Sequence, residues 1–217
     1  LAAFIGGLLA TILAYLTARQ NGRTEVVTLV LTGVAVNAVA GAIIAFMTFL
    51  GDTQAREEIV FWQLGSLNGT RWIQVAVAAP LIVIGIVGAG LVARQLDLLA
   101  LGERSARHVG VNVERLRMGV IVLVAVATSA AVAFAGVIAF VGLVVPHATR
   151  TIVGPAHPIL VPASVLGGAV VLLAADLTAR TIVPYADLPI GMLTAIIGGP
   201  FFFWLLRRTR RGAGGWS

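Results

Sequence analysis

Long uninterrupted runs of apolar residues alternate along the chain with short polar interruptions. Runs without any Asp, Glu, Lys or Arg cover residues 26–50, 72–93 and 118–149. Each reaches or exceeds the roughly 20 residues that a helix needs to cross about 30 Å of hydrocarbon. Further apolar segments lie at about 1–18, 158–179 and 189–206. This pattern predicts an all-α, polytopic integral membrane protein, a helical bundle that forms one transmembrane domain over residues 1–217.

The composition of the chain agrees with this class. Of the 217 residues 59% are hydrophobic and 11% are charged, whereas about a quarter of the residues of a soluble domain are charged. The net charge of +6 comes from 15 basic residues, all of them arginines. Because the arginines lie between the apolar runs, they indicate membrane topology and argue against a nucleic-acid partner.

The arginines also orient the apolar segments, since cytoplasmic loops of membrane proteins carry an excess of positive charge. Residues 19–23 and 94–117 are then cytoplasmic, and residues 51–71 lie outside. The same rule keeps the arginine-rich C-terminal tail, residues 207–211, in the cytoplasm only if one more crossing precedes it.

That extra crossing is predicted in the ambiguous stretch 143–157, at about Val144–Val153, and is expected to start near Pro146. About ten residues are too few to span the bilayer alone, so this segment must pack among other helices. The predicted fold therefore has about seven transmembrane segments, one of them short, and a cytoplasmic C-terminus.

Glycine is frequent, with 25 residues, and many lie inside the apolar segments. Small residues let helix backbones approach closely in lipid, where no hydrophobic force draws helices together. We therefore expect tight helix packing at Gly85, Gly88, Gly90, Gly167 and Gly168.

Residue types that soluble enzymes need are missing or scattered. A P-loop uses a lysine to reach the phosphates of ATP, and this chain has no lysine. Its histidines, His108, His147 and His157, lack the spacing of a metal-binding motif, and there is no cysteine. The sequence predicts a protein that is not an enzyme and has no cofactor or metal of its own, so that any ATP and Mg²⁺ would be bound by another subunit.

Asp176 is the one acidic residue within an apolar segment, and Arg180 follows four residues later on the same helical face. Charges inside a membrane are costly and usually paired, which makes these two residues a candidate functional site. A plain ion pair near the outer end of a helix explains them equally well.

Residues 99–116 read LALGERSARHVGVNVERL, a short amphipathic stretch between two apolar runs on the arginine-rich side. Gly102 and Gly110 allow the chain to break there into two short helices. The stretch resembles the cytoplasmic coupling segment of the permeases that import iron–siderophores, haem and vitamin B12, the FecCD type of ATP-binding-cassette importer.

Four further motifs follow the order of that family. FWQLGSLNGTRW at residues 61–72 resembles its W-x-x-G-S-L segment, and AGVIAFVGLVVPHATRTIVG at 135–154 resembles its most specific signature. Residues 160–180 and 187–206 match the remaining pattern, except that Asp187 stands where the family usually has Glu. Such permeases have about ten spans, so this chain, which does not begin with Met, is expected to lack the first three.

The resemblance implies several partners. Two permease subunits, identical or different, would surround a path across a bacterial cytoplasmic membrane, and two cytoplasmic ATPases would drive transport. An extracytoplasmic binding protein would deliver an iron–siderophore or a related metal chelate. A secondary transporter or channel acting alone is the alternative, and it would need ionisable residues in its spans, where only Asp176 qualifies. A non-transporting scaffold, which would not co-purify with an ATPase, is a third possibility.

The resemblance also implies three sets of site residues. The coupling segment, residues 97–115, would dock on the ATPase through Leu101, Gly102, Glu103, Ala106, Gly110 and Val111. Basic residues that meet acidic groups of the binding protein would be Arg180 and, as weaker candidates, Arg56 and Arg71. A helix break beside the translocation path would involve Gly142, Pro146 and His147.

Overall fold

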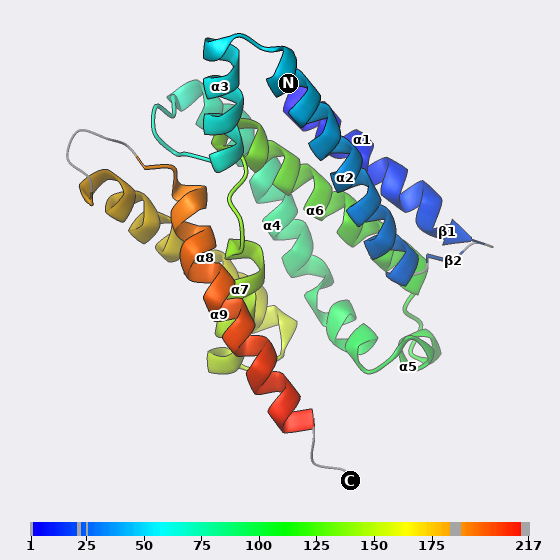
Figure 1. Ribbon diagram of the computed structural model, residues 1–217. Helices are drawn as coiled ribbons and strands as arrows, with labels where there is room; N and C mark the ends of the chain where they lie inside the picture. Colours follow the sequence, from blue (N-terminus) through cyan, green and yellow to red (C-terminus); the bar gives the residue numbers. More distant parts are fainter. Residues whose placement is uncertain (1, 21–22, 25, 183–187, 214–217) are drawn as a thin grey trace. The chain divides into compact units, whose positions relative to one another are not determined.

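The computed structural model describes residues 2–20, 23–24, 26–182 and 188–213. This described part is almost entirely helical, and its only strands, β1 (Arg19–Gln20) and β2 (Arg23–Thr24), form a two-residue antiparallel pair. Its nine helices, shown in Figure 1, are α1 (Ala2–Ala18), α2 (Val26–Leu50), α3 (Thr53–Leu64), α4 (Trp72–Ala100), α5 (Glu103–His108), α6 (Val113–Ala135), α7 (Val141–Val153), α8 (His157–Thr181) and α9 (Ile190–Ala213).

Seven of these helices coincide with the apolar segments of the sequence. By length and composition α2, α4, α6 and α8 can each cross a membrane, and α1, α7 and the first part of α9 are shorter apolar helices. Large apolar side chains such as Trp72 and Leu91 are exposed, whereas the buried core of the described residues is rich in alanine. Lipid can cover such a surface, and small residues let the helices approach closely. The prediction of an all-α, polytopic membrane protein is confirmed.

The chain folds into two compact units. The first consists of residues 1–60 and 70–134, and the second of residues 61–69 and 135–217. Helices α1, α2, α4, α5 and α6 belong to the first unit, α7, α8 and α9 belong to the second, and α3 begins in the first and ends in the second. One transmembrane domain over the whole chain stays a prediction.

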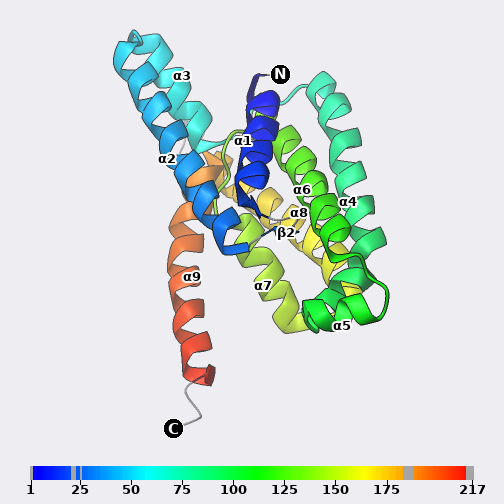
Figure 2. The same cartoon turned by 90° about the vertical axis from the view of Figure 1, so that its right-hand side faces the viewer.

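In the first unit, glycines bring α4 and α6 together. A Cβ added to Gly85 would lie 2.7 Å from the Cβ of Ala127, and one added to Gly88 would lie 2.5 Å from Cδ2 of Leu123. The expected tight packing is confirmed at these two positions, but Gly90 has no neighbour within 4 Å. Figure 2 shows α4 and α6 running side by side to α5, and Figure 1 shows α1 beside α2.

In the second unit, α7 packs along α8, and α9 contacts both helices. Gly167 of α8 makes close packing possible, because an added Cβ would lie 3.2 Å from Cγ1 of Val145. Gly168 has no neighbour within 4 Å. Tight packing is therefore confirmed at Gly167 and not at Gly168.

The long apolar run that starts at Met118 is divided differently from the prediction. Helix α6 ends at Ala135, and α7 begins at Val141. The short crossing therefore does not start near Pro146, which lies inside α7. Hydropathy misses this boundary because the residues of the break are themselves apolar, and only a backbone feature, the positive φ of Gly136 and Phe140, marks it.

Candidate functional site

The polar segment between α4 and α6 contains one short helix, α5, flanked by two glycines with left-handed backbone. Gly102 has φ 109° and ψ 147°, and Gly110 has φ 89°. An added Cβ would have no neighbour within 4 Å at either glycine. Both positions therefore need glycine for its backbone freedom and not for space.

The break at these two glycines was predicted correctly, but the two short helices were not. Only α5 is separate, and the rest of the polar stretch extends its neighbours. Helix α4 continues through Arg94 to Ala100, and α6 begins at Val113, before its apolar run. At 1.5 Å per residue these extensions add roughly 10 Å and 8 Å to the two helices. The segment is therefore carried beyond the apolar part of α4 and α6.

Backbone and side-chain hydrogen bonds fix both ends of α5. The Ala106 N–H donates to the Gly102 carbonyl oxygen at 3.0 Å, and the Val111 N–H donates to the Ala106 carbonyl oxygen at 3.0 Å. Asn112 then caps α6, because its Oδ1 accepts the Arg115 N–H at 3.0 Å. The turn from α5 into α6 is thus a defined structure.

A cluster of charges connects α5 with α6. Arg117 Nη2 lies 2.6 Å from Glu103 Oε1, and Arg117 Nη1 lies 3.3 Å from Glu114 Oε1. The second oxygen of Glu103 lies 3.4 Å from Arg107 Nη2 within α5. The Arg117 side chain is only 14% exposed, whereas that of Glu103 is half exposed. Glu103 is therefore engaged inside the chain through both of its carboxylate oxygens.

The predicted ATPase contacts differ in how accessible they are. Leu101 is 73% exposed, and Gly102, Glu103 and Gly110 are also exposed, whereas Val111 is partly buried. Ala106 is completely buried, so its side chain supports α5 from within. Val109, which the sequence analysis did not single out, is 63% exposed. An apolar residue within a polar segment is the feature of the sequence that could have indicated an exposed apolar contact at Val109.

The residues predicted at a helix break all lie on α7, Gly142 in its first turn and Pro146 and His147 in its interior. Gly142 and His147 are exposed, and Pro146 is partly buried. Pro146 has no N–H to donate to the carbonyl of Gly142 four residues earlier. The actual break comes before α7, where Phe140 has φ 65°, the only positive φ of a non-glycine residue among those described.

A junction of three glycines supports this break in the second unit. A Cβ added to Gly65 would lie 2.5 Å from the Val137 oxygen. A Cβ added to Gly136 would collide with the Trp62 oxygen, and one added to Gly191 would collide with the Leu64 oxygen. The Ser66 N–H donates to the Ala135 oxygen at 2.8 Å. Backbone therefore packs directly on backbone where residues 61–69 (the end of α3 and the loop after it), the break and the start of α9 meet.

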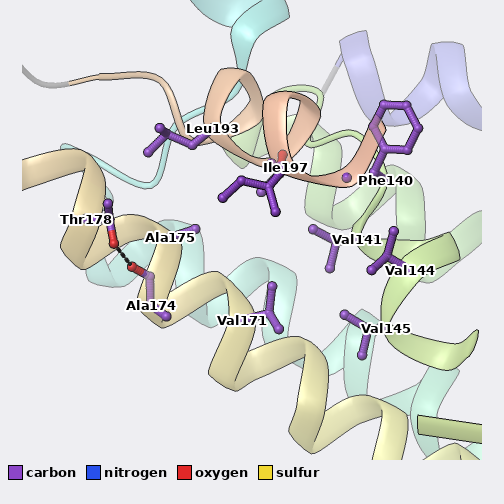
Figure 3. Close-up of a pocket in the computed structure, with 12 residues that line it drawn as sticks. Phe140, Val141, Val144, Val145, Val171, Ala174, Ala175, Thr178, Leu193 and Ile197 are labelled. Atoms are coloured by element: carbon purple, nitrogen blue, oxygen red, sulfur yellow. Dashed lines mark hydrogen bonds between the residues drawn. The ribbon is translucent and has the colours of Figure 1, made fainter. Parts of the chain in front are cut away.

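An apolar cavity of about 260 Å³ lies beside this break, between α7, α8 and α9. Figure 3 shows Phe140, Val144 and Ile197 among its lining residues, with the Thr178 hydroxyl donating to the Ala174 carbonyl oxygen at 2.7 Å. The other lining threonine, Thr194, donates to the Gly191 oxygen. The hydroxyl groups of both lining threonines thus already donate to helix carbonyl oxygens, so the surface of the cavity is apolar.

The three predicted docking arginines have different surroundings. Arg56 Nε donates to the carbonyl oxygens of Gly51 at 2.9 Å and Thr48 at 3.1 Å, so its guanidinium caps the end of α2. Arg71 is the residue just before α4, and its backbone N–H donates to Gln74 Oε1 at 2.9 Å. Both belong to the first unit, whereas Arg180 belongs to the second.

Asp176 and Arg180 form an ion pair on α8, with 2.9 Å between Arg180 Nε and Asp176 Oδ2. The Arg180 side chain remains 44% exposed. Arg180 also lies in the last turn of α8, where a positive charge is favourable to the helix dipole. The ion pair expected from the i,i+4 spacing is present, and a basic group is still accessible there.

Among the described residues, no three His, Cys, Asp or Glu side chains lie close enough together to hold a metal ion. Asp187, the residue at the family's usual glutamate position, lies outside the described residues. The contact between Glu103 and Arg117 was missed because 14 residues separate them and no helical spacing links them.

Known proteins resemble this chain over nearly its whole length. The model of the FecCD transport family matches residues 1–208. The hemin transport system permease protein HmuU of Yersinia pestis is 41% identical over 98% of this chain and 64% of its own length. The cobalamin import system permease protein BtuC of Halobacterium salinarum is 43% identical over 95% of this chain and 55% of its own length. The Fe(3+) dicitrate transport system permease protein FecD of Escherichia coli is 42% identical over 97% of this chain and 65% of its own length.

The chain thus spans less than two thirds of each of these three relatives. A solved structure described as a metal-chelate type ABC transporter, in an inward-facing conformation, matches with a TM-score of 0.84. It is 28% identical, and the match covers 95% of this chain and 72% of the solved one.

Proposed function

The chain belongs to the FecCD transport family, and we propose that it is the permease subunit of an ATP-binding-cassette importer that carries a metal chelate into the cytoplasm. The observation that carries this proposal is the family match over residues 1–208, together with a short polar helix held between two membrane-spanning helices. Family membership favours an ATPase-driven importer over a transporter, channel or scaffold that acts without one.

The relatives narrow the class of substrate. Hemin, cobalamin and Fe(3+) dicitrate, named in the relatives' descriptions, are all organic complexes of a metal. We therefore propose a preformed metal chelate as the substrate, with an iron–siderophore among the candidates. The chain supplies apolar helices and small residues for such a path and would leave the binding of ATP and Mg²⁺ to a partner ATPase.

The polar segment around α5 is the proposed docking site for that ATPase. Leu101 and Val109 give it exposed apolar side chains, and Gly102 and Gly110 expose backbone beside them. Closure of two ATPases on ATP would press on α5, and α4 and α6 would move with it. This is alternating access by the movement of rigid helices.

On the opposite side of the membrane we propose that Arg180 meets an acidic group of a substrate-binding protein. Its guanidinium is partly exposed although it pairs with Asp176. Charges of this kind mainly set the docking register and the encounter rate. Because Arg56 caps α2, it has a structural duty of its own and is a weaker candidate, as is Arg71.

The proposed assembly has two permease subunits, two ATPases and one binding protein in a bacterial cytoplasmic membrane. The arginine distribution supports a cytoplasmic position for α5 and for the C-terminus. Labelling single cysteines at Val109 and at Asn68 with a membrane-impermeant reagent tests this orientation. Only the Asn68 position should react from outside intact cells.

The function is tested by deleting the complete gene and restoring it on a plasmid. Growth is measured with hemin, Fe(3+) dicitrate, a ferric siderophore or cobalamin as the required nutrient, and the protein is purified to detect a bound ATPase. We expect rescue by at least one chelate and co-purification of an ATPase. Growth rescue without any ATPase would contradict the proposal.

A substitution in the segment sharpens this test. Gly102→Trp should abolish ATPase co-purification while membrane insertion stays intact, because it adds a bulky side chain and removes the left-handed backbone. Gly90→Trp is the matched control, since Gly90 lies on α4 without a neighbour within 4 Å. Co-purification should survive the control, and survival in the Gly102 variant would count against docking at this segment.

A further inference from the structure

We propose that Arg117 is a positioning residue that locks α5 to α6, so that a push on α5 moves α6 as one body. This inference rests on the proposed function, because it concerns how a docking segment passes movement to a membrane helix. It adds a residue outside the docking surface itself and assigns Glu103 a role inside the chain.

The geometry of the contact supports this role. The guanidinium of Arg117 reaches Glu103 in the first turn of α5 at 2.6 Å and Glu114 in the first turn of α6 at 3.3 Å. A planar guanidinium can hold two carboxylates at once in a fixed geometry. The Arg117 side chain is 14% exposed, so water competes with these contacts much less than at an open surface. One side chain therefore ties both helices together.

Backbone hydrogen bonds shape the turn between the two helices, but a glycine within it leaves room for movement. Residues 109–112 join α5 to α6, and Gly110 within them has φ 89° with no neighbour for an added Cβ. Gly102, on the α4 side, is equally open and has φ 109°. A glycine on each side allows α5 to pivot. A contact that bypasses residues 109–112 removes this freedom on the α6 side.

The carboxylate of Glu103 completes the lock. Its Oε1 accepts from Arg117 and its Oε2 accepts from Arg107. The same carboxylate therefore binds the last turn of α5 and the side chain that reaches over from α6. The Val111 N–H bonds to the Ala106 carbonyl and ties the end of α5 to the following turn. Movement of the exposed surface around Leu101 and Val109 would then reach α6 through Arg117.

The test compares Arg117→Gln and Glu103→Gln with unchanged protein in the complete transporter, reconstituted in lipid vesicles. Three quantities are measured: ATPase co-purification, ATP hydrolysis, and the number of chelates transported per ATP, with hemin, Fe(3+) dicitrate and cobalamin as probes. Arg117→Gln should keep the ATPase and hydrolyse ATP. In both variants transport per ATP should fall about fivefold or more, as expected when two sites lose their coupling.

Further variants separate positioning from general structure. The double variant should lose no more than either single variant, because both remove the same contact. Arg117→Lys should recover part of the transport per ATP, since an ammonium keeps the charge but cannot hold two carboxylates as a planar fork. Arg94→Gln is the control, because it removes an exposed arginine of α4 outside the segment and should leave the ratio unchanged.

A measurement without substrate or ATPase tests the lock directly. The sequence contains no cysteine, so spin labels can be placed at Val109→Cys and Val122→Cys. The distance distribution between them should be narrow in unchanged protein and broader in Arg117→Gln. An unchanged distribution, or unchanged transport per ATP, would overturn the proposal.

The two proposals fail in different ways. Loss of ATPase co-purification in Arg117→Gln would make Arg117 part of the docking surface and would overturn its positioning role. Absence of an ATPase from the unchanged transporter would instead refute the proposed function. If Arg117→Gln does not reach the membrane, Glu103→Gln and Arg117→Lys provide the same comparisons.

Discussion

The chain uses glycine for opposite reasons in two regions, the start of α9 and the segment around α5. At Gly191, in the second unit, an added Cβ would collide with the Leu64 oxygen and lie 2.6 Å from the Val137 oxygen. At Gly102 and Gly110, in the first unit, the space around an added Cβ is open and the constraint is a positive φ. The first kind of glycine seals a backbone junction, and the second lets a short helix change direction.

This difference predicts that substitutions in the two regions have different effects. A junction in which backbone packs on backbone has no side chain that could rearrange, so it holds the α6–α7 break in one geometry. The segment around α5 has exposed glycines, and its geometry depends on ion pairs that involve Glu103 and Arg117. We therefore expect substitutions at the junction to act on folding and substitutions near α5 to act on transport.

The largest effect on stability is expected for Gly191→Ala. Overpacking usually costs about 1–3 kcal/mol, and more where the obstacle is backbone, so we expect about 3 kcal/mol or more here. The apparent unfolding temperature of purified protein in detergent should fall strongly. Gly168→Ala, on α8 with no neighbour within 4 Å, is the control and should leave this temperature unchanged or slightly raised. Equal unfolding temperatures for the two variants would refute the junction.

Gly102→Ala should have a smaller effect on stability and a large one on transport. Forcing an L-residue into a backbone region reserved for glycine costs of the order of 1–3 kcal/mol, and the open segment can relax part of it. Unfolding temperature and chelate uptake are measured on the same preparation. A large loss of stability with normal uptake would contradict the expectation that substitutions near α5 act on transport and not on folding.

Gly88→Ala tests a third case, in which the added Cβ meets a side chain and not backbone. The nearest atom to an added Cβ is Cδ2 of Leu123, the far end of a flexible side chain, at 2.5 Å. Leu123 can change its rotamer, so the expected cost is about 1 kcal/mol or less. A loss of stability as large as that of Gly191→Ala would show that Leu123 cannot move aside. The space around the added Cβ would then determine the loss, whether the obstacle is side chain or backbone.

Arg180→Glu should have the smallest effect on stability. It breaks the ion pair with Asp176, and pairs this exposed contribute up to about 1 kcal/mol. Uptake should nevertheless fall if Arg180 meets an acidic group of a binding protein. Asp176→Asn is the control, because it breaks the same pair and keeps the arginine. Unchanged uptake in Arg180→Glu would remove this arginine from the docking surface.

Hydropathy and charge were sufficient to predict most of the fold. Seven apolar segments and the glycine-flanked polar segment follow from residue types that lipid and helix geometry select directly. The break after Ala135 did not follow, because Gly136 and Phe140 differ from helical residues only in backbone conformation. The contact between Glu103 and Arg117 also escaped, since a turn at Gly110 brings together residues with no periodic relation in sequence.

Within the candidate site, docking of an ATPase on the segment stays a prediction, and the structure adds the surroundings of its residues. Ala106 and Glu103 were both predicted as contacts of an ATPase. The structure shows that Ala106 is buried and that Glu103 binds two arginines of its own chain. Burial and partner choice depend on the fold of the segment, which residue types alone do not specify.

The length of α7 has a consequence for how the protein enters its membrane during synthesis. Its 13 residues rise roughly 20 Å, about 10 Å less than the hydrocarbon layer, and they include Pro146, His147 and Arg150. Such a segment is a poor signal for the insertion machinery. Helix α8 follows after three residues and packs along α7. The two helices should therefore enter the bilayer as a single hairpin, with α8 supplying the apolar length that α7 lacks.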